Sequence, residues 1–252
     1  MRIRPDITKH TVAASKEVAL SLSGCGFLGT YHIGAAVCLF RHGKMLMSKV
    51  KRIGGASAGS LVAALLVLHP ERLHKGLATF YQMAIELHSL PMGALTPKYV
   101  LQDRLLQIVD DHIPNDISPA QNRLMVSLTS YEGKQNKLIS KFHDRTHLIE
   151  TLLASCYIPG YSNADIAPID PAPWIYPMTF DFGKHLILAN ARNLVRGKHA
   201  LFPPPLDQLR SYYKQGFTDA HTFLKVNKLT DVQLTDELLE DGYMPEELKH
   251  LD

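Results

Sequence analysis

Residues 50–68 read VKRIGGASAGSLVAALLVL, and this stretch decides the fold expected for the chain. Its first five residues include β-branched side chains and favour a strand, whereas its last nine carry no charge and predict a buried helix. Between them, Ser57 lies in a G-x-S-x-G pattern bounded by Gly55 and Gly59. Small flanking residues let neighbouring backbone approach, so the pattern predicts a nucleophile elbow with Ser57 projecting outward. A small-residue turn without catalytic purpose would read the same, so the surrounding sequence must decide.

A glycine-rich loop precedes this segment. Residues 18–23 favour a buried strand, residues 24–29 read GCGFLG, and residues 32–41 predict a helix. Such a loop exposes backbone N–H groups at the positive end of the helix dipole, which suits a phosphate or a developing oxyanion. A dinucleotide site needs an acidic residue about twenty positions further on. No Asp or Glu occurs between Glu17 and Glu71, so an oxyanion loop is favoured, with a glycine turn chosen for close packing as the alternative.

The two motifs together resemble the patatin-like phospholipase family, whose members carry an oxyanion loop G-x-G-x-x-G, an elbow G-x-S-x-G and a later acid in D-G-[GA]. The resemblance extends over most of the chain, because similar sequence also occurs at residues 31–36, 41–44, 120–124, 200–204 and 211–217. It implies a three-layer α/β/α fold with a mixed, mainly parallel central sheet. It also implies a lipid acyl hydrolase, a triacylglycerol lipase or phospholipase, in which acyl transfer and retinyl esters are further options.

The resemblance assigns roles to seven residues. It implies a serine–aspartate dyad without a histidine, in which backbone donors stabilise the tetrahedral intermediate. Cys25 stands where relatives often have glycine, and we expect its side chain to pack as a small hydrophobe. The implied nucleophile is Ser57, the oxyanion loop comprises Gly24, Cys25, Gly26 and Gly29, and the elbow is flanked by Gly55 and Gly59.

The third family motif is missing where it is expected. The acid should follow a strand placed after the helix that ends near Cys156, yet the chain runs from Ser162 directly into Asn163. The sequence therefore predicts that one internal strand segment is missing. The single Asp-Gly pair, Asp241-Gly242, lies far beyond that position and matches a common turn signal. The catalytic acid stays unassigned, and a catalytically impaired lipid-binding or regulatory protein is the alternative function.

Two groups of histidines are candidates for other roles. His32 is the histidine nearest in sequence to the glycine-rich loop, and related sequences carry one there without a triad role, so we expect it to be structural. His143, His147 and Glu150 share one helix face at a spacing that can bind metal. Because no H-E-x-x-H pattern accompanies them, we expect a solvated face and neither metal nor cofactor.

Composition favours one intracellular domain. A chain of 252 residues with 46% hydrophobic residues can bury a substantial core, and three scattered cysteines are too few for a disulfide framework. The N-terminus has no apolar run of signal-peptide length. We expect a cytoplasmic protein, with a lipid droplet or another membrane surface as further locations, acting on an acyl lipid. The domain is expected at 18–225, after an extension at 1–17 and before an acidic tail at 226–252.

Charge is distributed unevenly along the chain. The net charge of +3 is too small to indicate nucleic-acid binding. Residues 230–252 hold eight carboxylates and one lysine, and we interpret them as a solvated tail. A local basic cluster is interpreted as a solvated turn, with contact to an anionic membrane surface as the alternative. The cluster comprises Arg41, Lys44, Lys49, Lys51 and Arg52.

The remaining periodicity gives the order of elements. Residues 70–89 and 101–108 have helical spacing, whereas 124–129 and 137–140 alternate and predict a hairpin. Residues 148–153 repeat at helical positions, so the core order is β-α-β-α-β-β-α, a mixed α/β pattern. A final amphipathic helix contains Leu206, Leu209, Tyr212, Tyr213 and Phe217, and we expect its apolar face to seal the core.

Overall fold

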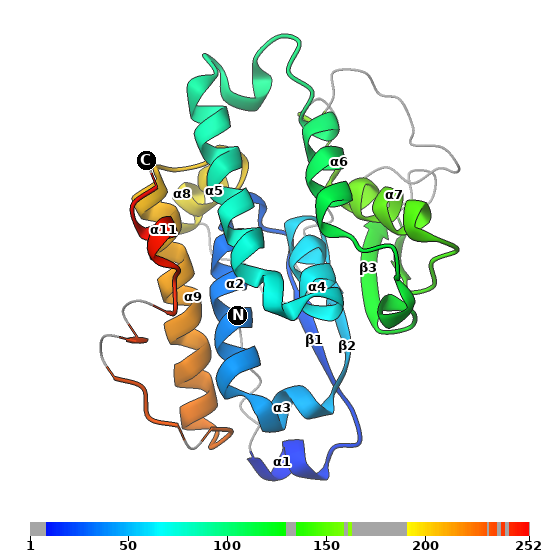
Figure 1. Cartoon of the computed structure of the whole chain (residues 1–252), viewed down its shortest axis with the longest axis vertical. Helices are drawn as coiled ribbons and strands as arrows, with labels where there is room; N and C mark the ends of the chain where they lie inside the picture. Colours follow the sequence, from blue (N-terminus) through cyan, green and yellow to red (C-terminus); the bar gives the residue numbers. More distant parts are fainter. Residues whose placement is uncertain are drawn as a thin grey trace.

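A four-stranded sheet lies at the centre of the molecule (Figure 1). The computed structural model describes residues 9–129, 135–158, 161–162, 191–230, 232–235, 238–239 and 242–251. The strands, in the spatial order β1-β2-β3-β4, are β1 (Val18–Leu22), β2 (Val50–Gly55), β3 (Leu124–Thr129) and β4 (Asn136–Ile139). β1, β2 and β3 are parallel, and β4 runs antiparallel to β3. The predicted mixed, mainly parallel α/β class and the predicted hairpin strands are confirmed.

One face of the sheet is buried under helices. The strand register aligns Leu20 with Ile53 and Ile53 with Leu124, which places these apolar side chains on the same face. Helix α4 packs against β1, β2 and β3, and α2 contacts both α4 and α5. The bounds are α2 (Gly29–His42), α3 (Lys44–Lys49), α4 (Ala58–Leu68), α5 (Leu73–Ser89), α6 (Leu101–His112) and α7 (Arg145–Cys156). The uncharged helix predicted after Ser57 is buried because it has no polar face to turn towards water.

The opposite face of the sheet is more open. Ala19 and Ser21 of β1 are exposed, and the side chain of Leu138 on β4 is 56% exposed. In β1 the exposed positions alternate with partly buried ones, as the two-residue period of a strand requires, whereas in β4 three successive residues are exposed. The open face is continuous with the cavity described below, because Ala19, Ser21 and Leu138 all line that cavity.

The long helix α9 (Leu206–Val226) packs against α2 at very short range. A Cβ atom on Gly34 of α2 would lie 2.0 Å from the carbonyl oxygen of Tyr213, and one on Gly216 of α9 would lie 2.0 Å from that of Tyr31. Glycine at both positions therefore lets the two backbones touch. Tyr213 and Phe217 are fully buried, so the expectation that this helix seals the core is confirmed.

The expectation that residues 230–252 form a solvated tail is wrong for part of the described segment. Val232 is 47% exposed, but Met244 and Leu248 are at most 5% exposed, and the Tyr213 hydroxyl donates a 2.7 Å hydrogen bond to the Gly242 carbonyl. The short helix α11 (Glu246–Lys249) places Leu248 against the core while Glu246 stays exposed. The count of carboxylates misled the prediction, because a few spaced apolar residues are enough to dock an otherwise charged segment.

The N-terminal end of the described chain also packs on the domain. Helix α1 (Lys9–Ala14) buries Val12, and the Lys9 backbone N–H donates to the Asn227 carbonyl at 3.1 Å. The domain limits at residues 18 and 225 remain a prediction. In the parts of the chain given above, no helix has the combined length and apolarity needed to span a membrane.

Candidate active site

Ser57 occupies a sharp turn between β2 and α4. β2 ends at Gly55, α4 begins at Ala58, and Ser57 has φ 51° and ψ −135°, in the left-handed half of backbone space. Residues other than glycine adopt this backbone conformation only at a cost of about 1–3 kcal/mol. A Cβ on Gly55 would lie 2.4 Å from the Gly59 carbonyl carbon, and one on Gly59 would lie 2.4 Å from the Ser23 carbonyl oxygen. Both elbow glycines are therefore required by packing.

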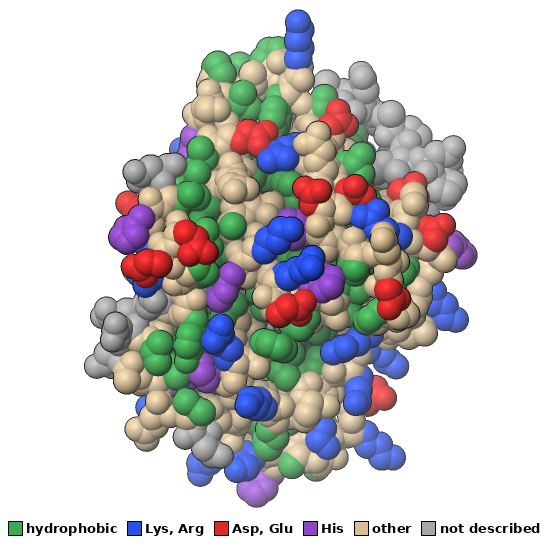
Figure 2. Space-filling view, in the orientation of Figure 1, with side chains coloured by type: hydrophobic (Ala, Val, Ile, Leu, Met, Phe, Trp, Pro, Cys, Tyr) green, Lys and Arg blue, Asp and Glu red, His purple; other side chains and the backbone are tan. Residues whose placement is uncertain are grey.

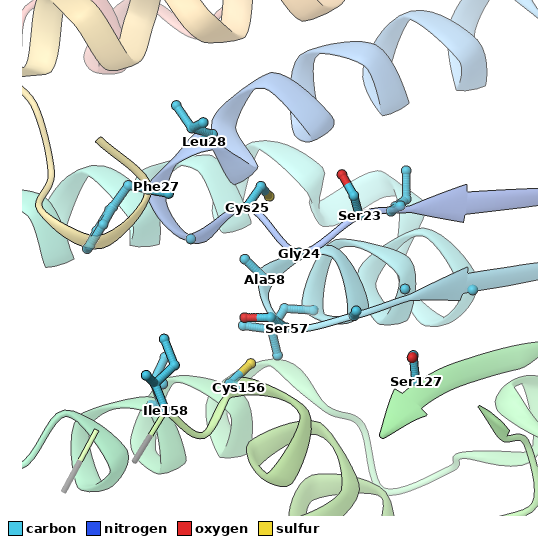
Figure 3. Close-up of a pocket in the computed structure, with 18 of the residues that line it drawn as sticks. Ser23, Gly24, Cys25, Phe27, Leu28, Ser57, Ala58, Ser127, Cys156 and Ile158 are labelled. Atoms are coloured by element: carbon cyan, nitrogen blue, oxygen red, sulfur yellow. The ribbon is translucent and has the colours of Figure 1, made fainter. Parts of the chain in front are cut away.

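The glycine-rich loop lies beside this turn (Figure 3). A Cβ on Gly24 would be 3.5 Å from the Cβ of Ser57, which is ordinary van der Waals contact. Gly26 has φ 50° and starts a short 3₁₀ turn, and α2 begins at Gly29. The fold thus brings Gly24, Cys25 and Gly26 together with Ser57 around one cavity, from two strands that are neighbours in the sheet. Gly29 does not line this cavity, and a Cβ there would meet the Phe80 ring at 2.6 Å.

Two thiols flank Ser57, and both line the same cavity. Figure 3 shows Ser57 between the loop that carries Cys25 and the end of α7 that carries Cys156. Burial raises the pKa of both thiols, that of Cys156 to about 12, although a hydrogen bond with Ser57 partly opposes the rise for Cys156. Both sulfurs are therefore protonated near neutral pH and contribute bulk and apolar surface.

His32 supports the loop from the first turns of α2. Its Nε2 lies 3.0 Å from the Ser23 carbonyl oxygen, so Nε2 carries the proton and donates it. Burial lowers the pKa of His32, which keeps the ring neutral. This contact holds the residue immediately before Gly24, as the structural role predicted for His32 requires.

Helix α8 (Ala191–Leu201) completes the site and is absent from the sequence-based prediction. A Cβ on Gly26 would lie only 1.8 Å from the Ala200 carbonyl oxygen, so α8 rests directly on the loop. The Tyr161 hydroxyl donates to the Leu201 carbonyl and holds the end of this helix. Its amphipathic spacing is the one sequence signal that points to it.

A cavity of about 1190 Å³ opens in front of Ser57. Apolar side chains of α5 and α6 form much of its wall, namely Phe80, Met83, Leu101, Leu105 and Ile108. The volume exceeds the roughly 300–1,000 Å³ of typical small-molecule pockets. Arg52 and Arg196 are the charged side chains among the described lining residues, and no Asp, Glu or His of the described ranges lines it.

The described residues therefore provide no carboxylate beside Ser57. Residues 163–190, which include Asp165, Asp170 and Asp181, lie outside the described residues, as does Asp241. A Cβ on Gly242, the neighbour of Asp241, would contact Tyr213 and Phe217 on α9, and neither of those lines the cavity.

The other candidate clusters lie elsewhere. The ring of His147 stacks on that of His143 at 4.7 Å, and its Nδ1 accepts a hydrogen bond from the His143 backbone N–H. Among the residues the structure describes, no three His, Cys, Asp or Glu side chains are grouped to hold a metal ion. Lys and Arg side chains gather over the lower part of the face in Figure 2, near α1 and α3. The predicted basic cluster runs from the end of α2 through α3 to the start of β2, which is the strand end opposite Ser57, and of its members only Arg52 lines the cavity.

A serine at a positive-φ turn after a parallel strand, beside a glycine-rich helix start and over a large apolar cavity, is typical of α/β proteins that carry a nucleophile elbow. Within that class the chain belongs to the patatin-like phospholipase family. Residues 20–181 match the family profile described as Patatin-like phospholipase.

Three relatives illustrate the range of the family. The chain is 36% identical over 245 residues to human patatin-like phospholipase domain-containing protein 4, covering 83% of this chain and 97% of the relative. It is 31% identical over 248 residues to the rat patatin-like phospholipase domain-containing protein 2, covering 83% of this chain and 51% of the relative. It is 29% identical over 247 residues to the mouse omega-hydroxyceramide transacylase, covering 82% of this chain and 40% of the relative. The chain thus spans about half or less of the two longer relatives.

The alignment with the human relative is longer than the part of this chain that it contains. The 83% of this chain that aligns with the human relative corresponds to about 209 of its 252 residues, whereas the alignment is 245 residues long. Roughly 36 positions of that alignment therefore have no residue in this chain.

Proposed function

We propose that this chain acts on acyl lipids with Ser57 as the nucleophile. The observation that carries the proposal is the position of Ser57, held at φ 51° beside Gly24 and lining a large, mainly apolar cavity. Its hydroxyl oxygen attacks the ester carbonyl carbon while the acyl chain lies along α5 and α6. The C–O bond to the alcohol breaks as the acyl-enzyme forms, and the proton lost by Ser57 is transferred to the leaving alcohol oxygen. Water or a second alcohol then accepts the acyl group.

The loop supplies the oxyanion donors in this mechanism. Within the part of the chain that the structure describes, no hydrogen bond takes up the backbone N–H groups of Gly24, Cys25 or Gly26. Free N–H groups beside the attacking oxygen stabilise the tetrahedral intermediate, each by about 3–4 kcal/mol. Cys25 donates as well as glycine would, because its side chain leaves the N–H unchanged.

The substrate class follows from the cavity and from the relatives. Its apolar wall fits a fatty acyl chain, which suits a neutral glycerolipid, a phospholipid or a retinyl ester. The names of the relatives include a phospholipase domain and a transacylase, so the proposal covers both hydrolysis and acyl transfer.

A catalytically impaired lipid-binding protein is the second candidate. Two observations favour it: no described carboxylate lines the cavity, and roughly 36 positions of the alignment with the human relative lack a residue in this chain. Loss of the general base in a serine hydrolase lowers turnover by about 10⁴- to 10⁶-fold. Lipid binding in the cavity would survive that loss.

A fluorophosphonate probe separates the two candidates. The proposed enzyme reacts covalently at Ser57, so intact-mass spectra of the wild-type chain show one adduct that is absent from Ser57→Ala. A chain that binds a fluorescent fatty acid in the cavity but forms no Ser57 adduct supports the impaired protein instead. Adduct formation that persists in Ser57→Ala refutes Ser57 as the nucleophile.

Contact with a lipid surface is proposed at the connection between α5 and α6. This connection lies at the top of the molecule in Figure 1. Met92 and Leu95 in it are 59% and 44% exposed, and the helices on both sides line the cavity. Exposed apolar side chains at the rim of a lipid site enter the interface readily. We expect Met92→Ser/Leu95→Ser to reduce flotation with phosphatidylcholine vesicles several-fold. The Val226 side chain is 73% exposed at the far end of α9, and Val226→Ser should leave flotation unchanged.

A further inference from the structure

Ser57 is held by buried serines at both of its backbone polar groups. Its carbonyl accepts a 2.7 Å hydrogen bond from the Ser60 hydroxyl, one turn along α4. Its N–H donates a 2.8 Å hydrogen bond to Oγ of Ser155, which is 98 positions away near the end of α7. Ser60 and Ser155 are both fully buried. The first contact is local, whereas the second ties the elbow to a different part of the fold.

The orientation of the Ser155 hydroxyl is fixed by a third group. Its proton is donated to the Ser127 carbonyl on β3 at 2.9 Å, so a lone pair of the same oxygen faces the Ser57 N–H. The result is a chain of two hydrogen bonds from the elbow through α7 to the sheet. A buried hydroxyl with both roles occupied has no freedom to rotate, and so it defines one position for the Ser57 N–H.

The Ser57 backbone needs such a restraint because its conformation is strained. The φ of 51° is unfavourable for serine and persists only where surrounding structure imposes it. The next residue on α7, Cys156, hydrogen-bonds with the Ser57 side chain, so the end of this helix contacts both the backbone and the side chain of Ser57. A displacement of α7 would therefore move the Ser57 hydroxyl relative to the loop that begins at Gly24.

We infer that Ser155 is a positioning residue, which sets the orientation of Ser57 towards the glycine-rich loop through its hydrogen bond to the Ser57 N–H. The inference rests on the proposed function of Ser57. Removal of the hydroxyl leaves a buried N–H without its acceptor and lets the elbow relax. Misplacement of a reacting group by about 1 Å costs on the order of 100-fold in rate.

The test compares Ser155→Ala with Thr151→Val. Thr151 lies one turn earlier on α7, is 5% exposed, and donates its hydroxyl to the His147 carbonyl within the same helix. We expect the rate of fluorophosphonate labelling at Ser57 to fall by about 10- to 100-fold in Ser155→Ala and to stay within twofold of wild type in Thr151→Val. Equal losses in the two variants, or none in Ser155→Ala, would overturn the inference.

Two conservative variants, Ser155→Thr and Ser155→Cys, keep the inference testable if Ser155→Ala misfolds. Ser155→Thr keeps a hydroxyl and should restore labelling to within threefold of wild type. Ser155→Cys places a weaker sulfur acceptor at the same position, so we expect at least a tenfold loss in labelling at an unchanged melting temperature. If Ser155→Ala does not fold, wild-type labelling in Ser155→Cys refutes the inference.

Amide hydrogen exchange provides a readout that needs no catalysis. Exchange at the Ser57 amide should be at least tenfold faster in Ser155→Ala than in wild type and unchanged in Thr151→Val. If the wild-type chain does not react with the probe at all, the proposed function fails. The hydrogen-bonded restraint is then judged by exchange alone, and equal exchange in all three proteins contradicts it.

Discussion

A Cβ atom placed on Gly26 would lie 1.8 Å from the carbonyl oxygen of Ala200. Gly26 also has φ 50°, so two independent constraints require glycine there. Helix α8 therefore touches the proposed oxyanion loop backbone to backbone, with no side chain between them. The position of the loop depends on α8 as well as on its own sequence.

Gly26→Ala should damage both stability and reactivity. The added methyl group must displace either the loop or α8, and alanine is strained at this φ, so we expect the free energy of unfolding to fall by about 2–3 kcal/mol. Labelling of Ser57 should slow in the protein that remains folded. Urea unfolding and timed probe labelling measure the two effects.

Gly197→Ala is the matched control for that substitution. Gly197 lies on the same helix α8, and a Cβ there would meet no heavy atom within 4 Å. Alanine is favoured over glycine in a helix by about 1 kcal/mol, so this variant should be slightly more stable than wild type. If Gly26→Ala has the same free energy of unfolding as Gly197→Ala, α8 does not restrain the loop.

Ser57→Gly should stabilise the fold while removing the proposed nucleophile. Glycine adopts φ 51° without the cost that serine bears, whereas Ser57→Ala keeps that cost. We expect Ser57→Gly to exceed Ser57→Ala in free energy of unfolding by about 1 kcal/mol. Thermal and urea unfolding of the two variants provide the comparison, and a less stable glycine variant would show that the elbow is not strained.

The contact between α2 and α9 predicts a large effect of single methyl groups. Gly34→Ala and Gly216→Ala would each place a Cβ 2.0 Å from a carbonyl oxygen of the facing helix. We expect each to lower the free energy of unfolding by about 3 kcal/mol, because a backbone cannot move aside as a side chain can. Near-wild-type midpoints in urea would mean that the helices have room to separate.

His32 predicts a loss of stability in mild acid. Its pKa is lowered in the folded chain, chiefly by burial, so the unfolded chain binds more protons as the pH falls through the ordinary histidine value of about 6.5. Stability is therefore fully present above that value and is lost below it. Burial likewise lowers the pKa of His42 and His74, which add to the effect.

His32→Gln isolates the share of this one residue. Glutamine can still donate a hydrogen bond to the Ser23 carbonyl but does not titrate. We expect a shallower fall in the free energy of unfolding between pH 7.5 and 5.5 than in wild type. Parallel pH profiles for the two proteins would contradict a buried, neutral His32.

The parts of the site that are close in sequence could be predicted from it. Small residues around Ser57, a strand before it and an uncharged helix after it are local features, and together they specify the turn. The same holds for the loop from Gly24 to Gly29 and for the parallel α/β class, since hydrophobic periodicity reports local structure. The sequence alone also shows that no D-G-[GA] pattern follows the helix that ends near Cys156.

The parts that depend on distant contacts could not be predicted. Nothing around Ser155 shows that its hydroxyl meets the Ser57 N–H 98 positions away, and nothing near Gly26 indicates that a carbonyl of α8 lies against it. The C-terminal segment was misjudged for the same reason, because burial of Leu248 depends on the surface it meets.

A serine elbow beside a glycine-rich loop can be read from local sequence, because backbone freedom and hydrophobic pattern are encoded within a few residues. The contacts that hold the elbow through Ser155 on α7, and the loop through Ala200 on α8, become visible in the folded chain. A hydrogen bond or a van der Waals contact needs two partners within a few ångströms, and folding brings together partners that are far apart in the sequence.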